Sequence, residues 1–303
     1  MKRLIEYIAE SLIKEEISNE AKQIIEKLQK TNNLGEYVDD LNALLKDKDA
    51  KQILTKAFVS SGDDNPIELD AKMEFISVKD LHPTQNEIDV DKSLGYPFKG
   101  TKEAEVNMKE FFDNSDKVNM PFPLVTFQGE YILDGHHRWS QVYTFNPECK
   151  MQCFDITQSN GEKIDEQQAL KICQGILAAK RAIDKKGSIP KNTVQGANLF
   201  KMNEKEVKEK IINYCEKNED AAKIIEKYEK VNNAEKLADK LCENLMLLRK
   251  DNEKYANKGN ERGVMPQTDK GGDDPEDMKT AKPDVKGSVL HAMSHAKINP
   301  KIV

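Results

Sequence analysis

The sequence has few of the features that mark membrane and secreted proteins. No apolar run approaches the roughly 20 residues that a membrane-spanning helix needs. The first ten residues also lack the apolar stretch of a secretory signal. Aromatic residues make up only 6% of the 303 residues and charged residues 33%, which is typical of a soluble, helix-rich chain. We therefore expect a protein that neither crosses a membrane nor is exported.

Cysteine is also scarce, and its number is odd. Five cysteines are scattered over the second half of the chain, which favours reduced thiols in a cytosolic setting. Cys149 and Cys153 lie close together, but their spacing is one residue longer than the common zinc knuckle and no second pair follows. The sequence therefore predicts structural thiols and no metal-binding residues.

Positive charge is not concentrated anywhere along the chain. The formal net charge is −6, and no stripe of Lys and Arg is free of interleaved Glu. A nucleic-acid-binding protein usually shows a basic patch or stripe, because phosphate contacts dominate its affinity. DNA binding is therefore not supported by charge.

Hydrophobic periodicity divides the chain into four regions. Residues 1–58 and 164–256 show the spacing of amphipathic helices. Residues 72–157 contain short β-prone runs instead, at 74–78, 123–128, 130–133 and 150–156. The tail, residues 257–303, is rich in Gly, Pro, Asp and Lys, and composition predicts an extended stretch.

These patterns predict an α+β fold. A small mixed-sheet domain at 72–157 would be flanked by helical regions that pack on it or on each other. Gln128 and Gly129 would form a hairpin turn between two of its strands.

The two helical regions share a repeat at a constant offset of 200 residues. Ile24-Ile25-Glu26-Lys27 recurs as Ile224-Ile225-Glu226-Lys227, and both copies continue into an Asn-Asn pair. Gapless matching favours a duplicated helical hairpin in which Asn residues cap the helices. Chance similarity between two Lys- and Glu-rich helices remains the alternative.

Residue types suited to chemistry stand together in one segment, Tyr-Ile-Leu-Asp-Gly-His-His-Arg-Trp-Ser at 131–140. The pattern is a strand that stops at Gly135 and turns into a helix. The first N–H groups of a helix lack intrahelical partners and carry partial positive charge, and Arg138 adds a fork suited to phosphate. His136 and His137 can donate protons or hydrogen bonds near neutral pH. The alternative is a polar turn that merely closes a strand.

The Asp-Gly-His-His-Arg segment resembles the second conserved box of the ParB/sulfiredoxin superfamily, and is closest to the form in its free-serine-kinase branch. Residues 78–88, with Pro83-Thr84-Gln85, resemble the first box of phage ParB-like domains, and the two boxes occur in the expected order. The resemblance covers about residues 72–157 and implies nothing direct about the rest of the chain.

This resemblance implies that the protein binds ATP or another nucleoside triphosphate with Mg²⁺, as a phosphotransferase or NTPase. The phosphate-binding residues would be Thr84, Gln85, Gly135, His136, His137 and Arg138. The catalytic residues would be Glu87, Asp134, His136 and His137, with Asp134 orienting a histidine or helping to hold Mg²⁺.

The segment also departs from the family pattern. Sulfiredoxins need a Cys where His136 stands, and chromosome-partition ParB proteins have Glu-Arg-Arg where this chain has His-His-Arg. No helix-turn-helix reader is recognisable downstream. Sulfiredoxin repair chemistry and CTP-clamp behaviour are therefore not expected.

Met1 to Glu10 resembles the short capsid-targeting peptides of internal head proteins in large tailed phages, which end in Ile-x-Glu as Ile8-Ala9-Glu10 does here. An ordinary first helix is the alternative. The resemblance implies a bacterial-host cytoplasmic protein or one packaged in the virion, with capsid or other virion proteins and further copies of itself as partners. A non-catalytic virion or scaffold protein that retains a ParB-like module is thus the alternative to an enzyme, and a ParB-like nuclease is a weaker one.

Two islands with apolar residues, 261–269 and 289–293, interrupt the tail. Such islands commonly dock, so we expect the tail to lie across the globular part or a neighbouring subunit. Composition alone would favour a flexible terminus.

Overall fold

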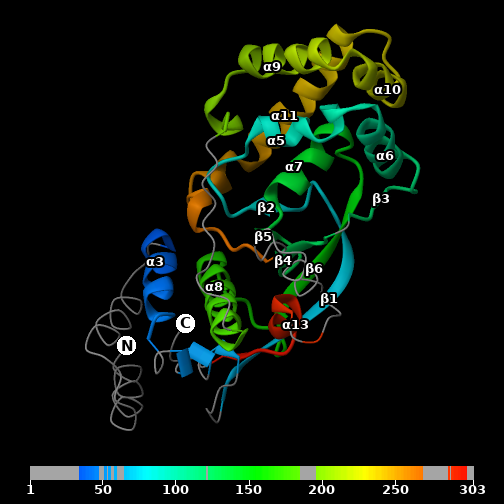
Figure 1. The fold of residues 1–303 in the computed structure, drawn as a ribbon. Coiled ribbons are helices and arrows are strands. Elements are labelled where there is room, and N and C mark those ends of the chain that lie inside the picture. Colours follow the sequence, from blue (N-terminus) through cyan, green and yellow to red (C-terminus); the bar gives the residue numbers. More distant parts are fainter. Residues whose placement is uncertain are drawn as a thin grey trace. The chain divides into compact units, whose positions relative to one another are not determined.

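The computed structural model describes residues 34–47, 51–52, 54–55, 58–59, 65–120, 122–184, 196–268, 286 and 288–298 (Figure 1). Over these residues the chain combines helices with a mixed sheet, which confirms the predicted mixture of α and β structure. None of the helices described is long and apolar enough to span a membrane. The capsid-targeting-like peptide at 1–10 lies outside the described residues.

The chain divides into two compact units. One, called here the site unit, consists of Met73–Cys153 and Thr193–Arg262. The remaining residues form the second unit. Residues 73–153 of the predicted sheet region, 72–157, thus share a unit with the helices that follow residue 193, although these lie far away in the sequence.

Three short strands lie at the centre of the site unit. Strand β2 (His82–Pro83) runs parallel to β5 (Tyr131–Asp134), and β5 runs antiparallel to β4 (Leu124–Phe127). Gln128 and Gly129 join β4 to β5 with φ angles of 55° and 68°. Two successive positive φ values are the signature of a type I′ turn, so the predicted hairpin is confirmed.

The sheet of the site unit continues from β4 to β6 (Lys150–Gln158) and then to β1 (Ile67–Ser77). Strand β3 (Lys117–Val118) pairs in parallel with the start of β6. Both β1 and β6 extend past the boundary of the site unit. The order β2-β5-β4-β6-β1 contains parallel and antiparallel pairs, as expected for a mixed sheet.

Helices occupy the stretch between β2 and β3, to which the sequence pattern gave no assignment. Helix α5 (Val90–Gly95) begins at Asp89, whose side chain accepts a hydrogen bond from the N–H of Asp91 and so caps the helix. A 3₁₀ turn, η1 (Pro97–Lys99), leads into α6 (Thr101–Phe112). These elements connect the first box of the predicted site to the rest of the sheet.

The helix that follows β5, α7 (His136–Phe145), is the structural centre of the site unit. It packs against α5 and against α11 (Ala234–Ala256). Its Trp139 is fully buried, and the indole Nε1 donates a hydrogen bond to the Val78 carbonyl oxygen at 2.8 Å. This bond anchors the helix to the end of β1 without leaving the indole N–H unsatisfied.

The predicted helical region, 164–256, is helical in most of its described residues, but it is divided between the two units at residue 193. The part in the site unit begins with a 3₁₀ turn, η2 (Leu199–Lys201), continues as α9 (Glu204–Lys217) and α10 (Glu219–Glu229), and ends with α11. Helix α11 packs against α9, α10 and α7, and α10 packs against α6. The apolar faces of these helices and of the sheet therefore share one core, which includes Phe98, Phe111, Leu124, Ile132, Ile211, Leu241 and Leu245.

The second copy of the repeat forms the connection between α10 and α11. Lys230 ends α10 in the left-handed conformation (φ 57°), and the Asn233 side chain accepts a hydrogen bond from the N–H of Lys236 at 2.9 Å. Asn233 therefore caps α11, as the repeat predicted. Residues 24–33 of the first copy lie outside the described residues, so the duplication itself stays a prediction.

In the second unit, α8 (Glu166–Asp184) packs against α3 (Leu34–Leu44) and α13 (Val289–Met293). Of the described tail, residues 263–268, 286 and 288–298 belong to this unit, whereas 257–262 belong to the site unit. Strand β7 (Lys297–Ile298) pairs with the start of β1, and Leu290 and Met293 are buried. A second contact lies further upstream: the buried Gln174 side chain of α8 donates to the Val264 carbonyl oxygen. For these residues the tail docks on the globular part of its own chain.

Candidate functional site

The strand, glycine and helix start that the sequence predicted are present at the end of β5. Gly135 has a φ of 100°, and a Cβ atom there would lie 2.6 Å from Leu124 Cδ2 and 2.8 Å from Arg138 Nη2. Both the conformation and the space therefore require glycine. Helix α7 begins at the next residue with no side-chain cap and no acidic residue in its first turn.

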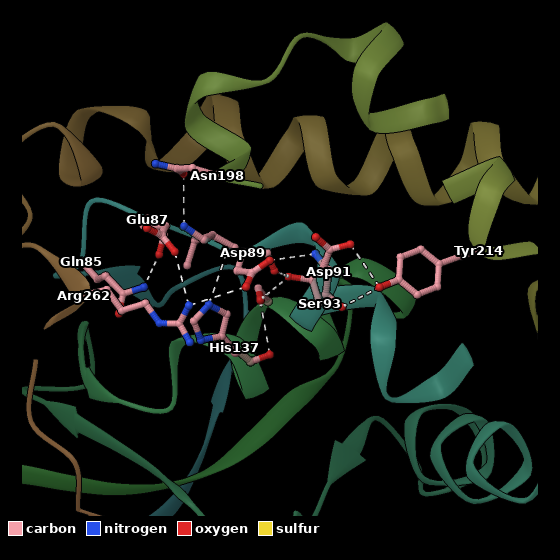
Figure 2. Close-up of polar contacts among 11 residues, drawn as sticks. Gln85, Glu87, Asp89, Asp91, Ser93, His137, Asn198, Tyr214 and Arg262 are labelled. Carbon is pink, nitrogen blue, oxygen red and sulfur yellow. Dashed lines mark hydrogen bonds and ion pairs between the residues drawn. The ribbon is translucent and has the colours of Figure 1, made fainter. Parts of the chain in front are cut away.

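The second part of the site is the segment from Thr84 to Asp89, called here the box-one loop. The N–H of Thr84 donates to Nε2 of His136 at 3.2 Å. The N–H of Asp89 donates to Nε2 of His137 at 3.3 Å (Figure 2). The structure thus brings the two sequence boxes together, and the two histidines form the contact between them.

These contacts fix the chemical state of the two rings. A ring nitrogen that accepts a hydrogen bond from a backbone N–H carries no proton, so each ring is a neutral acceptor. Burial lowers the pKa of His136 from 6.5 to about 3. Burial, followed by the charges of Arg262 and Lys92, holds the pKa of His137 well below its ordinary value. Proton donation by these rings near neutral pH, which the sequence suggested, finds no support in this geometry.

Arg138 lies at the helix start, where the sequence predicted a fork suited to phosphate, but its side chain is not fully exposed. Its side chain is half-buried, and Nη2 donates to the Pro123 carbonyl oxygen at 3.1 Å. The same nitrogen would lie only 2.8 Å from a Cβ atom at Gly135, so the guanidinium packs closely against this glycine. Burial lowers the pKa of Arg138, whereas the nearby Asp134 raises it. Because an arginine starts from a very high pKa, the guanidinium stays cationic.

Thr84 and Gln85, which the resemblance implied as nucleotide contacts, are buried. Thr84 Oγ1 donates to the Ile132 carbonyl oxygen at 2.6 Å, and Gln85 Nε2 donates to the Glu87 carbonyl oxygen. The donor groups of these two side chains therefore stabilise the loop and its contact with β5. In this conformation they support the site rather than face a ligand.

Arg262 is a site residue that sequence reasoning did not single out. Its Nη1 lies 3.3 Å from Glu87 Oε1 and 3.6 Å from Asp89 Oδ2, and its side chain is almost fully buried (Figure 2). It stands 175 residues after Glu87 in the chain. The sequence marked Arg262 only by its position in the segment with apolar residues at 261–269. That position did not indicate which residues Arg262 contacts.

Backbone and amide contacts hold the box-one loop from two further sides. Asn198 accepts from the N–H of Ile88 at 3.3 Å and donates to the Asn86 carbonyl oxygen at 3.0 Å (Figure 2). Asn260 pairs with the loop through backbone bonds of 2.8 and 2.9 Å to Thr84 and Asn86. The loop is therefore rigidly positioned, although it contains no regular secondary structure.

A neighbouring polar network fixes helix α5 beside the loop. Tyr214 Oη donates to Asp91 Oδ1 at 3.1 Å, and Lys210 Nζ lies 2.8 Å from the same oxygen. Ser93 and Ser140 share a hydrogen bond of 2.7 Å that joins α5 to α7. Figure 2 shows Asp91 and Ser93 continuing the line of polar side chains that starts at Gln85. Helix α5 therefore has a fixed position relative to the start of α7.

The described residues contain no group of three or more His, Cys, Asp or Glu side chains that could hold a metal ion. All five cysteines are buried thiols. Burial is also the main cause that raises the pKa of Cys149 to about 12 and of Cys215 to about 11. Cys149, Cys153, Cys215 and Cys242 belong to the hydrophobic core of the site unit.

Comparison with known proteins assigns no family. No protein-family model matches the chain, and no curated protein or solved structure is significantly similar to it. Function must therefore be inferred from the chemistry of the site itself.

Proposed function

We propose that the chain is a phage-type, ParB/sulfiredoxin-like protein that binds the phosphate groups of a nucleoside triphosphate at the start of α7. The observation that carries this proposal is the junction at Gly135. There a strand ends in a left-handed glycine, a helix begins without a side-chain cap, and the guanidinium of the half-buried Arg138 lies close to the glycine. Helix N–H groups, the helix dipole and a cationic fork all favour a bound anion.

In this proposal the backbone from Gly135 to His137 holds the phosphates, and Arg138 supplies the counter-charge. The Pro123 carbonyl oxygen orients the guanidinium by accepting from Nη2. His136 and His137 act as positioning residues, because their rings fix the box-one loop across the helix start. Asp134, at the end of β5, is the carboxylate nearest in sequence for Mg²⁺, which uses one or two carboxylates together with phosphate oxygens.

If the protein also transfers a phosphoryl group, the bound triphosphate supplies that group. The residue that would accept the proton of the attacking hydroxyl is then Glu87 rather than a histidine. Its side chain is 21% exposed, and Arg262 holds it in place from the buried side. A carboxylate orients such a nucleophile in other phosphoryl-transfer enzymes.

A non-catalytic module is the second candidate. It is favoured by the fact that both histidines and Arg262 are engaged in holding the box-one loop. In that case the ParB-like unit would serve as a folded support in a phage particle or in the cytoplasm of an infected cell. Hydrolysis or transfer of a phosphoryl group would distinguish the enzyme from the non-catalytic module.

The proposal is tested by thermal shift and calorimetry with ATP, ADP, CTP and GTP, each with and without Mg²⁺, and with inorganic triphosphate. A ligand at 100 times its Kd should stabilise the protein by about 2.7 kcal/mol. Arg138→Ala should weaken binding by roughly 10- to 100-fold, because a charge-assisted hydrogen bond contributes about 1.5–3 kcal/mol.

Arg249→Ala is the matched control. Arg249 is also half-buried and donates to a backbone carbonyl, that of Met202, but it lies on α11 and pairs with Glu253 of the same helix. This variant should bind as the wild type does. Binding by Arg138→Ala at wild-type strength, or no shift with any of the ligands, would exclude the proposed phosphate site. Phosphate release that Glu87→Gln abolishes would select the enzyme over the non-catalytic module.

A further inference from the structure

Two of the five histidines in the chain lie outside the site unit, and the proposed function does not use them. His291 belongs to α13 and His295 to the turn that follows this helix (Figure 1). The other three are held by hydrogen bonds within the site unit: His82, His136 and His137. Neither ring of the pair in the second unit thus belongs to the site at the start of α7.

The rings of His291 and His295 lie side by side. Their centres are 4.5 Å apart and their planes are tilted by 36°. His295 is exposed and His291 is half-buried. A spacing of four residues places two side chains on the same face of a helical turn, which explains their proximity.

Hydrogen bonds decide which nitrogen of the His295 ring carries the proton. Nδ1 lies 2.9 Å from the His291 carbonyl oxygen and 2.7 Å from Ser294 Oγ. Ser294 Oγ donates its own proton to the same carbonyl oxygen at 2.9 Å, so it acts as an acceptor toward His295. Nδ1 is therefore the protonated nitrogen, and Nε2 keeps its lone pair.

This tautomer is the one that a metal-binding histidine adopts. Such a ring donates its second nitrogen to a carbonyl oxygen, a carboxylate or water, which orients the ring and leaves the other nitrogen for the metal. With a metal–nitrogen bond of about 2.0–2.1 Å, the centre of a bound ring lies about 3.2 Å from the metal. Two rings that bind one ion at an angle of about 90–109° then have centres about 4.5–5.2 Å apart. The separation of 4.5 Å between His291 and His295 fits this range.

We propose that His291 and His295 chelate one late divalent transition-metal ion, of the group Zn²⁺, Ni²⁺ and Cu²⁺. Imidazole nitrogen suits these ions, whereas Mg²⁺ and Ca²⁺ prefer oxygen ligands. The described residues offer no group of three metal-binding side chains, so water completes the coordination and the site is weaker than a four-ligand structural site. Lys297, the nearest charged residue in the sequence, is paired with Glu68 at 2.7 Å, so its charge is compensated.

A bound ion joins α13 to the turn that leads to β7. The Ser294 N–H donates to the Leu290 carbonyl oxygen at 3.1 Å in this turn, and β7 begins at Lys297 and pairs with β1. Because the chelate needs both rings in this arrangement, the ion stabilises the docked form of this part of the tail. At ten times its Kd, the ion should make opening of the turn about tenfold rarer.

The first test is calorimetry of the untagged, full-length chain with Ni²⁺, Zn²⁺ and Mg²⁺. Ni²⁺ and Zn²⁺ should bind at one ion per chain, and Mg²⁺ should not bind. His291→Ala and His295→Ala should each lower the affinity at least about tenfold, because the second ring acts at a high effective concentration. The double variant should lose little more than either single variant, since one remaining ring no longer chelates.

A matched control keeps five histidines but separates the two rings. Lys250 is exposed on α11 of the site unit, so His295→Ala combined with Lys250→His should bind as weakly as His295→Ala alone. Circular dichroism would show that the variants fold. Hydrogen exchange at the Ser294 amide should slow with Ni²⁺ in the wild type and not in His295→Ala.

Three outcomes would overturn the proposed chelate. They are no binding of Ni²⁺ or Zn²⁺ by the wild type, single variants that bind as tightly as the wild type, and a separated pair that binds as tightly as the native one. None of these outcomes depends on nucleotide binding, because both rings belong to the second unit.

Discussion

Nε2 of His136 accepts a hydrogen bond from the N–H of Thr84 at 3.2 Å, and so joins two segments that lie 52 residues apart in the chain. The ring is buried and serves as a hydrogen-bond acceptor. A side chain chosen from the sequence for proton transfer thus has a positioning role in the structure.

The first prediction concerns pH. The pKa of His136 is about 3 in the folded protein and about 6.5 in an unfolded chain. Between these values the unfolded chain binds a proton that the folded protein does not, so the free energy of unfolding rises with pH. The stabilisation is complete above about pH 6.5 and is lost as the pH falls toward 3. By pH 5 the loss from this ring alone should be about 2 kcal/mol, measured by urea unfolding.

His136→Gln is the control for this prediction. A glutamine oxygen can accept the Thr84 N–H but does not titrate. The variant should therefore lose part of the dependence on pH while it keeps the fold. The pKa of His137 is also lowered, chiefly by burial, so this ring contributes to the dependence that remains. An unchanged slope in His136→Gln would show that this ring is not the source.

The second prediction concerns Arg262, whose guanidinium lies between the Glu87 and Asp89 carboxylates. Arg262→Met should lower the free energy of unfolding by about 3–5 kcal/mol, because it leaves a buried carboxylate without its counter-charge. Lys205→Met, which removes an exposed pair with Glu209, should change it by no more than about 0.5 kcal/mol. Equal effects of the two substitutions in urea unfolding would contradict the assigned role.

The third prediction compares two glycines with positive φ. Gly135→Ala adds a methyl group that would meet Leu124 and Arg138, whereas Gly129→Ala meets nothing within 4 Å. Gly129→Ala should therefore lower the free energy of unfolding by only about 1–2 kcal/mol, which is the strain of an alanine in the left-handed conformation. Gly135→Ala should cost more than this and also weaken anion binding, because Arg138 must move. Melting curves with and without triphosphate would measure both effects, and equal melting temperatures would contradict the close packing at Gly135.

The fourth prediction concerns the stability of Arg138→Ala. The loss of a fully exposed phosphate fork would leave the melting temperature nearly unchanged, because such a group contributes little to folding. Because Nη2 donates to the Pro123 carbonyl oxygen from a half-buried position, we expect the variant to lose about 1–3 kcal/mol in chemical denaturation. Arg138→Lys keeps the charge but not the planar fork, so its free energy of unfolding should lie between those of the wild type and Arg138→Ala. A variant as stable as the wild type would mean that this hydrogen bond contributes nothing to folding.

Local patterns in the sequence determined much of this protein. The Gln128-Gly129 turn, the stop of β5 at Gly135, the cap of α11 at Asn233 and the amphipathic helices after residue 164 all depend on residues close together in the chain. Their physical causes are backbone conformation, capping and periodicity, which a short segment contains in full. Helix α5 escaped prediction because its six residues are too few to show a stripe. The buried residues of α6, Ala104, Asn107, Met108 and Phe111, do recur at helical spacing, but the small and polar residues among them weaken the hydrophobic pattern.

The tertiary structure alone decided how the site is built. Arg262 and Asn198 reach the box-one loop from positions more than 100 residues away, and no local pattern records such a contact. The chemical state of His136 was decided in the same way. Its residue type allows proton transfer at neutral pH, but its burial and its contact with the Thr84 N–H make it a neutral acceptor. Desolvation depends on everything that surrounds a group, and only the folded chain supplies those surroundings.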